Sequence, residues 1–245
     1  MDVNEMSIDA IDDVQRKAAK IAGFALLFAV MIVIFANYGV SFRLIVPGDA
    51  AETARNILAN ELLFRINVAC DLLYVADILV LMAALYVILK PVNQGLALTA
   101  VFCRLVYALM WVVTALNMLD ALALLGQDNY LRVFEVNKLQ TLARLHLRGS
   151  WDAYYVGLPF WGLASMLCSY LWFKSGYIPR ALAGFGLIAS AWCVLCAFTF
   201  IIYPNFKDTV DASWFDTPLV LFEIVTGFWL LIRGLKPSGV AAGTR

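Results

Sequence analysis

The sequence has few charged residues and a single histidine. Only 15% of its 245 residues are charged, compared with about 25% in an ordinary soluble domain, and 18 Lys and Arg balance 18 Asp and Glu. A net charge of zero gives no reason to expect nucleic acid as a partner. The lone His146 argues against bis-His haem, multi-His zinc and di-iron sites supplied by this chain alone, so we expect no metal and no cofactor.

Several catalytic patterns are also missing. The sequence has no phosphate-binding P-loop and no Gly-rich dinucleotide fingerprint. No Lys lies in the middle of an apolar block, which excludes a retinal-type Schiff base. Asp71 and Asp77 lack the Gly-x-Gly-Asp setting of intramembrane aspartyl proteases, and a Ser–His dyad would require His146 to fold inward. We therefore assign no catalytic residue and do not favour an enzyme.

All five cysteines lie in apolar blocks, where cysteine behaves as a small hydrophobic residue. Cys193 and Cys196 form a C-x-x-C spacing that can indicate redox chemistry. The segment around them has no charged neighbour that would favour a thiolate, so we favour a packing role.

Long apolar blocks dominate what the sequence does contain. Hydrophobic residues make up 63% of the chain, against about 45–50% in soluble domains. Each block has about the 20 residues that one crossing of a bilayer needs. We therefore predict an all-α, polytopic transmembrane bundle that forms a single domain over residues 1–245. Its six spans are predicted at about residues 21–38, 61–89, 95–125, 151–173, 180–203 and 214–232.

Two further helices are expected outside these spans. Residues 50–60 have helical propensity and are expected to run straight into the second span. Residues 130–146 alternate apolar and basic residues, which predicts an amphipathic helix on the membrane surface between spans three and four. A helix packed against the ends of the spans is the alternative. Residues 1–13 carry five acids and so do not resemble the basic start of a signal peptide.

Basic residues near the span ends set the expected orientation, because they are enriched on the cytoplasmic side. One side would hold Arg16, Lys17, Lys20, Lys90, Lys174, Arg180, Arg233, Lys236 and Arg245, mostly in short segments. The other side would hold Arg43, Arg55, Arg132, Lys138, Arg144, Arg148 and Lys207 on longer segments. We expect the first side, with both termini, to be cytoplasmic.

Ionisable residues inside the spans are the informative feature, because such residues are costly in a bilayer and usually face the interior of a bundle. They are Glu61, Arg65, Asp71, Asp77, Arg104, Asp120 and Glu223. At about 100° per residue, the second span places Asn67, Cys70, Asp71, Tyr74 and Asp77 on one face. The third span aligns Arg104, Tyr107, Trp111 and Met118 in the same way.

Distances along the helices predict ion pairs between these residues. Spans two and three are joined by a turn at Pro91, and Asp77 and Arg104 lie about 20 Å and about 19 Å from it. The same reasoning pairs Arg65 with Asp120 near the outer surface, although Glu61 is also an i, i+4 neighbour of Arg65. Glu223 lies at nearly the depth of Arg104 and could complete an Asp77–Arg104–Glu223 cluster.

Two interpretations of these residues stay open. Paired charges can simply fix helix register, which makes Glu61, Arg65 and Asp120 candidates for structural ion pairs. Alternatively, the buried charged residues of spans two, three and six form a charged seam that binds a ligand, an ion or a proton. The candidates for that role are Asp71, Asp77, Arg104, Glu223, Asn67, Tyr74 and Tyr107. Asp71 has no obvious partner and is the first acid to test for proton binding.

A set of these positions resembles a membrane family known as domain of unknown function 4386. The matching residues are Asn56, Ile57, Glu61, Phe64, Arg65, Asp71, Leu72, Asp77, Leu85, Tyr86, Pro91, Val92, Phe102, Arg104 and Leu105, then the run Ser175 to Arg180, Glu223 and Trp229. The resemblance covers nearly the whole chain. It implies a six-helix protein of the bacterial inner membrane and implies no activity.

Three classes of function remain at this stage. The first is a protein that binds or transports a small solute or a proton through the buried charged seam. The second is a membrane enzyme or accessory subunit that acts on lipid or isoprenoid substrates. The third is a structural subunit of a larger membrane complex. Expected partners are membrane lipids, with a small-molecule ligand or a membrane-protein partner as further possibilities.

Overall fold

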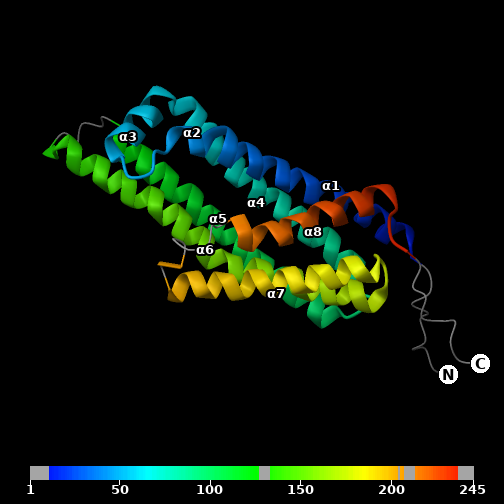
Figure 1. Ribbon diagram of the computed structural model, residues 1–245. Helices are drawn as coiled ribbons and strands as arrows, with labels where there is room; N and C mark the ends of the chain where they lie inside the picture. Colours follow the sequence, from blue (N-terminus) through cyan, green and yellow to red (C-terminus); the bar gives the residue numbers. More distant parts are fainter. Residues whose placement is uncertain (1–10, 127–132, 204, 207–212, 237–245) are drawn as a thin grey trace, which may run out of the picture. The chain divides into compact units, whose positions relative to one another are not determined.

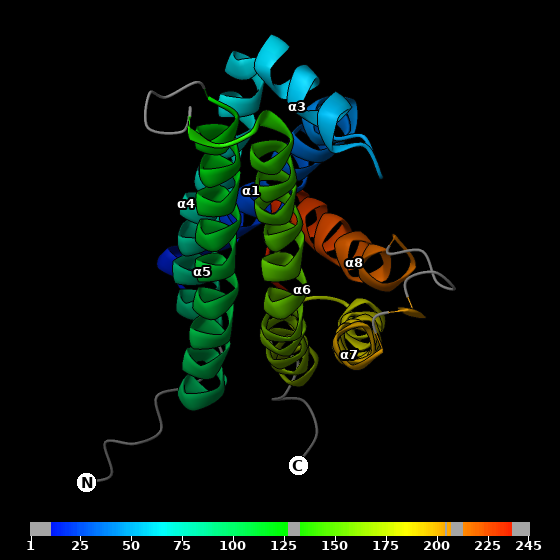
Figure 2. The same ribbon diagram turned by 90° about the vertical axis from the view of Figure 1, so that its left-hand side faces the viewer.

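The computed structural model describes residues 11–126, 133–203, 205–206 and 213–236, and the regular elements within these ranges are helices, without strands (Figures 1 and 2). In chain order the elements are α1 (Asp13–Ile34), the π-helix η1 (Phe35–Ser41), α2 (Phe42–Leu44), α3 (Ala50–Ala59), α4 (Glu61–Leu89), α5 (Gln94–Leu125), α6 (Val136–Ser175), α7 (Arg180–Ile202) and α8 (Ser213–Ile232).

Six helical segments of the described chain are long and apolar enough to cross a membrane. They are Asp13–Leu44, Glu61–Leu89, Gln94–Leu125, Val136–Ser175, Arg180–Ile202 and Trp214–Ile232. This confirms the predicted all-α class and the number of spans. The chain is therefore described as a multi-pass membrane protein.

Most helix ends coincide with residues that cannot continue a helix. α4 ends at Leu89, just before Lys90 and Pro91, because a residue preceding proline avoids the α region. α6 ends at Ser175 and is followed by Gly176, whose φ of +68° is a left-handed conformation that glycine adopts without strain. These signals are why the predicted bounds of spans two, three, five and six agree with the structure to within one residue.

The segment before the second span differs from the prediction. Residues 50–59 are helical, but α3 does not run straight into α4, because Asn60 leaves the helical region at φ −130° and ψ 41°. The start of α3 is fixed by Asp49, whose Oδ1 accepts a hydrogen bond of 2.8 Å from the Glu52 amide. α3 is thus a separate short helix with its own cap.

The segment before the fourth span also differs. Residues 136–146 are helical, as expected, but they form the first turns of the 40-residue α6 and not a separate surface helix. Residues 127–132, which include the start of the predicted amphipathic segment, lie outside the described residues. At about 1.5 Å per residue α6 is about 60 Å long, twice the hydrocarbon thickness of about 30 Å. It contains Pro159, which lacks the amide needed to bond the carbonyl one turn earlier.

The first span contains an irregularity that hydrophobic periodicity did not indicate. The chain leaves α-helical geometry after Ile34 and runs as a π-helix over Phe35–Ser41 before α2. π-helical turns are rare and occur frequently at functional sites. Ala36, Val40 and Ser41 of this segment are buried.

The chain divides into two compact units, and four of the long helices contribute residues to both. The first unit contains residues 11–28, Asp77–Tyr107 and the described part of Leu158–Arg245. Close helix contacts in this unit depend on glycine. A Cβ on Gly23 of α1 would lie 2.9 Å from the Gly227 carbonyl oxygen of α8. Small residues at such contacts let two helix backbones approach in a membrane, where van der Waals packing drives association.

The second unit contains residues Ala29–Ala76 and Ala108–Gly157. Its core joins the π-helical region, α3, the first half of α4, the second half of α5 and the start of α6. The buried side chains that meet there are Val40, Leu44, Ala54, Ile57, Phe64, Val68, Ala115, Met118, Ala121, Leu122, Leu125, Ala143 and Leu147.

Replacing Gly23 by alanine tests the close contact between α1 and α8. The added methyl group meets a backbone oxygen that cannot rotate away, so the variant should unfold at a lower temperature in detergent, with a loss of about 1–3 kcal/mol. Gly184→Ala is the matched control, because a Cβ there has no neighbour within 4 Å. Equal melting temperatures for the two variants would contradict the proposed contact.

Candidate functional site

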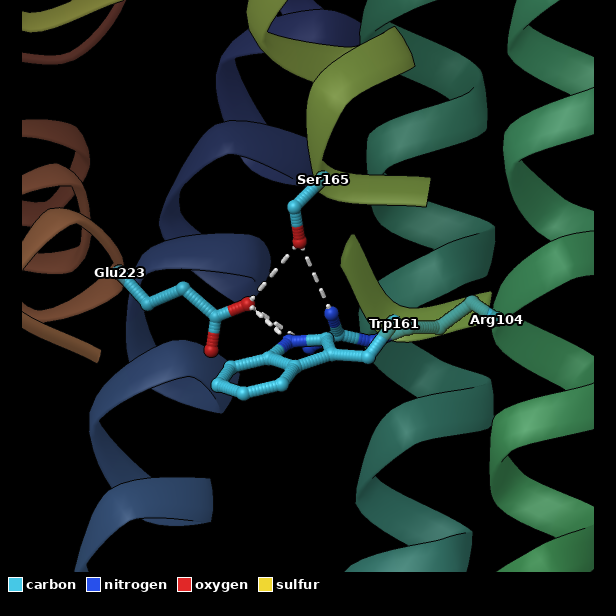
Figure 3. A network of polar contacts seen from close by, with 4 residues as sticks. All are labelled: Arg104, Trp161, Ser165 and Glu223. Carbon is cyan, nitrogen blue, oxygen red and sulfur yellow. Dashed lines mark hydrogen bonds and ion pairs between the residues drawn. The ribbon is translucent and has the colours of Figure 1, made fainter. Parts of the chain in front are cut away.

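The first unit contains a buried polar cluster built from three helices (Figure 3). α5 supplies Arg104, α6 supplies Trp161 and Ser165 one turn apart, and α8 supplies Glu223. Arg104 is 2% exposed and Glu223 is 7% exposed. Arg104 and Glu223, which are 119 residues apart in sequence, thus meet in an apolar interior.

One carboxylate oxygen of Glu223 receives all the hydrogen bonds given to this side chain. Oε1 accepts from Arg104 Nη2 at 2.9 Å, from Trp161 Nε1 at 2.8 Å and from Ser165 Oγ at 3.5 Å. Ser165 Oγ also accepts from Arg104 Nη1 at 3.2 Å. In Figure 3 the other oxygen points away from this network. Charge-assisted bonds of this kind are about twice as strong as neutral ones and fix the side chains in place.

The Arg104 guanidinium makes cation–π contacts with two aromatic rings. Its Cζ atom lies 5.6 Å from the centroid of the Tyr107 ring and 5.7 Å from that of Trp161. The two rings are stacked on each other, with centroids 5.8 Å apart and planes inclined by 15°. A desolvated cation near aromatic faces gains on the order of 2 kcal/mol. Tyr107, predicted on the same face as Arg104, therefore helps to stabilise the buried charge.

A small cavity of about 30 Å³ adjoins the cluster. Arg104, Ser165 and Glu223 line it together with Thr226, and the remaining walls are mainly apolar side chains of α1, α4, α6 and α8. A water molecule needs about 10–15 Å³ of such volume. The cavity can therefore hold one or two waters but no organic solute.

Asp77 lies near this cluster without joining its hydrogen bonds. It is 8% exposed, and its Oδ2 atom has no hydrogen-bond partner among the described residues. One turn further along α4, Leu81 lines the cavity. Asp77 is close enough for the charges of both Arg104 and Glu223 to act on it. The structure thus brings Asp77 near both Arg104 and Glu223, and the Asp77–Arg104 ion pair stays a prediction.

The predicted polar face of the second span is buried over most of its length. Asn67, Asp71, Tyr74 and Asp77 are all buried, and Cys70 at the edge of the face is partly buried. Asn67, Asp71 and Tyr74 belong to the second unit, whereas Asp77 belongs to the first. The Tyr74 ring packs edge-on against Trp111 at 4.7 Å between centroids.

The predicted outer ion pair between Arg65 and Asp120 is wrong. Arg65 Nε lies 2.7 Å from Glu61 Oε1 on the same helix, because the i, i+4 partner needs no particular packing of another helix. Asp120 Oδ2 instead lies 3.6 Å from His146 Nδ1, which also lies 3.3 Å from Asn117 Oδ1. Both pairs are largely exposed and have little effect on stability.

Sequence reasoning found Arg104 and Glu223 but missed Trp161 and Ser165. The signal was present, because Trp161, Ser165 and Ser169 follow one another at i, i+4 spacing in an otherwise apolar span. Thr226 likewise follows Glu223 by three residues. Hydroxyl and indole N–H groups are common in membrane helices, so they stand out only once a charged partner is located beside them.

A known protein family matches most of the chain. The family described as Domain of unknown function (DUF4386) matches residues 21–234. The chain belongs to this family. An "Uncharacterized protein" from Archaeoglobus fulgidus is 26% identical over 171 residues, which cover 70% of this chain and 85% of the relative. No solved structure matches the chain. The four residues of the Arg104 cluster all lie inside the matched DUF4386 range.

Separating Arg104 from Glu223 should be much more harmful than replacing both. Glu223→Leu leaves a buried guanidinium without its counter-charge and should cost about 3–5 kcal/mol, measured by thermal unfolding in detergent. The double variant Arg104→Met with Glu223→Leu should recover a large part of that loss. Arg65→Ala, which removes an exposed pair, serves as the control and should change stability by less than about 1 kcal/mol. Strictly additive effects in the double variant would contradict the coupling.

Proposed function

We propose that this DUF4386 protein binds a proton at Asp77, Arg104 and Glu223 and moves it across the membrane. The observation that carries the proposal is a buried charge imbalance beside a water-sized cavity.

The buried charges of the first unit do not balance. Among the described residues of the first unit, Asp77 and Glu223 are the buried acids and Arg104 is the buried base. Arginine stays protonated in proteins, so it balances only one carboxylate. An uncompensated charge in a low-dielectric interior is costly. One proton, shared between Asp77 and Glu223, removes this cost.

The size of the cavity favours a proton over a solute. Binding sites for small organic molecules enclose about 300–1,000 Å³, far more than the 30 Å³ found beside Arg104. One or two waters in that space can accept and donate protons. This supports the proton interpretation of the charged seam.

The polar atoms around the cavity are suited to hold such water. Thr226 lines the cavity, and its Oγ1 atom has no partner among the described residues. Glu223 lines it as well and uses only Oε1 for its hydrogen bonds. Buried polar atoms without protein partners are usually satisfied by ordered water. Water bound between these two side chains would connect the carboxylate to its surroundings.

Proton flux into liposomes tests the proposal. The purified full chain is reconstituted with a pH-sensitive dye inside, and a potassium gradient with valinomycin provides the driving force. We expect acidification faster than in protein-free liposomes, and a decrease of at least tenfold in Asp77→Asn and in Glu223→Gln. Both substitutions conserve shape, and Gln can still accept the Trp161 and Ser165 hydrogen bonds.

Asp120→Asn is the matched control, because this acid is exposed and interacts with His146. It should transport protons as the wild type does. Flux equal to that of empty liposomes, or flux unaffected by Asp77→Asn and Glu223→Gln in folded protein, would show that the cluster only fixes helix packing.

We further propose that the protein resides in the bacterial inner membrane with the segments before α1 and after α8 in the cytoplasm. The support is the distribution of Lys and Arg near the span ends, with short basic connections such as Lys90 and Lys174 on the proposed inner side.

Reporter fusions in a bacterial host test this orientation. Green fluorescent protein fused after Arg245 should fluoresce, since it folds in the cytoplasm. Alkaline phosphatase fused after Gly126 should be active, since the connection between α5 and α6 would face the periplasm. The opposite pattern at both positions would reverse the proposed topology.

A further inference from the structure

The second unit contains a buried acid that the proposed function does not use. Asp71 on α4 is 3% exposed, and its Oδ2 atom has no hydrogen-bond partner among the described residues. It is the only Asp, Glu, Lys or Arg classed as buried in the described part of this unit. An ionised carboxylate in such surroundings would have no counter-charge.

A second unsatisfied acceptor lies one turn away on the same face of α4. Asn67 is 2% exposed, and its Oδ1 atom also lacks a partner among the described residues. Both hydrogens of its amide are used, since Nδ2 donates to Ser41 Oγ at 3.1 Å and to Met118 Sδ at 3.8 Å. Because the thioether sulfur can only accept, these contacts place the amide nitrogen on that side and leave Oδ1 as an acceptor.

A single proton on Asp71 would provide both unpaired oxygen atoms, Asp71 Oδ2 and Asn67 Oδ1, with a hydrogen bond. Ionised Asp71 can only accept hydrogen bonds, as can Asn67 Oδ1, so the two oxygens cannot bond each other. A protonated carboxyl group carries one O–H donor. Side chains at i and i+4 are neighbours on a helix surface, so this O–H can be donated to Asn67 Oδ1. A proton also needs no cavity, unlike a metal ion or a water molecule.

Two other titratable side chains lie on this side of α4. They are Cys70, next to Asp71, and Tyr74, one turn further on. On α6, the Tyr154 ring packs against the Trp111 ring of α5, with centroids 6.0 Å apart. Trp111 in turn packs against Tyr74 of α4. In the described residues, the remaining acids and bases of η1, α2, α3, α5 and α6 in this unit are at least partly exposed.

Asn67 connects this pair to the π-helix. Ser41 is the last residue of η1, and its Oγ atom is the acceptor of the Asn67 amide. The irregular turn therefore contacts α4 through the same side chain that would receive the Asp71 proton.

We propose that Asp71 is a second proton-binding site, that its proton is donated to Asn67 Oδ1, and that this bond holds the π-helical segment against α4 through Ser41. The site is independent of the Arg104 cluster. Protonation should stabilise the native state, so the folded protein binds more protons here than the unfolded chain does. Stability then falls as pH rises, in the sense required by linkage.

Infrared spectroscopy of the full chain in lipid nanodiscs tests whether the Asp71 carboxyl group carries a proton. At neutral pH the wild type minus Asp71→Asn difference spectrum should contain the C=O stretch of a protonated carboxylic acid, shifted in D₂O. The same subtraction with Asp120→Asn should lack it. Absence of this band in the Asp71 difference spectrum, with the variant folded, would overturn the proposal.

Hydrogen exchange of residues 35–46 tests the connection to the π-helix. After correction for the intrinsic pH dependence of exchange, we expect at least tenfold faster exchange in the wild type when the pH is raised from neutral to alkaline. Asp71→Asn should lose this response, because its amide can donate to Asn67 Oδ1 at every pH. Ser41→Ala should retain the infrared band and lose the exchange response.

Three results would count against the inference. They are an unchanged pH response in Asp71→Asn, an unchanged response in Ser41→Ala, and a response that follows sodium concentration at constant pH. Proton flux through the Arg104 cluster is measured separately with Asp77→Asn and Glu223→Gln. Failure of one proposal is therefore distinguishable from failure of the other.

Discussion

The first unit depends on the ion pair between Arg104 and Glu223. A guanidinium that is 2% exposed is tolerated only because a carboxylate lies 2.9 Å away and two aromatic rings flank it. The carboxylate in turn requires Trp161 and Ser165 on one face of α6. α5, α6 and α8 are thereby brought into one relative register within this unit, since a shift of any of the three would leave a charge without its partner.

Among the described residues, three buried acids (Asp71, Asp77 and Glu223) accompany one buried base, Arg104. The surroundings of the additional acid differ between the two units. In the first unit Asp77 lies near the pair formed by Arg104 and Glu223, two residues that line a cavity with room for water. In the second unit Asp71 is the only buried charged residue among those described, and Asn67, one turn away on α4, has an amide oxygen without a partner among the described residues. The same face of α4 thus carries one buried acid near an ion pair and another near an unpaired acceptor.

The bounds of α4, α5, α7 and α8 were predictable from the sequence, whereas the partners of the charged residues were predictable only in part. Apolar length and residues such as Pro91 and Gly176 determine where a helix can begin and end, which is why α4 begins and ends where expected. Depth along a helix follows from its rise, so Arg104 and Glu223 were rightly placed together. The direction of a side chain about the helix axis depends on tertiary packing, and for that reason the partner predicted for Arg65 is wrong. The π-helix leaves no signal in hydrophobic periodicity.

Pro159 interrupts the backbone hydrogen bonding of α6. The helix is about 60 Å long by its 40 residues, and Pro159 lies two residues beyond Gly157, where the second unit ends. A missing amide hydrogen bond is a common cause of helix bending. α6 therefore lacks one backbone hydrogen bond in its interior, close to the residue at which its sequence passes from the second unit to the first.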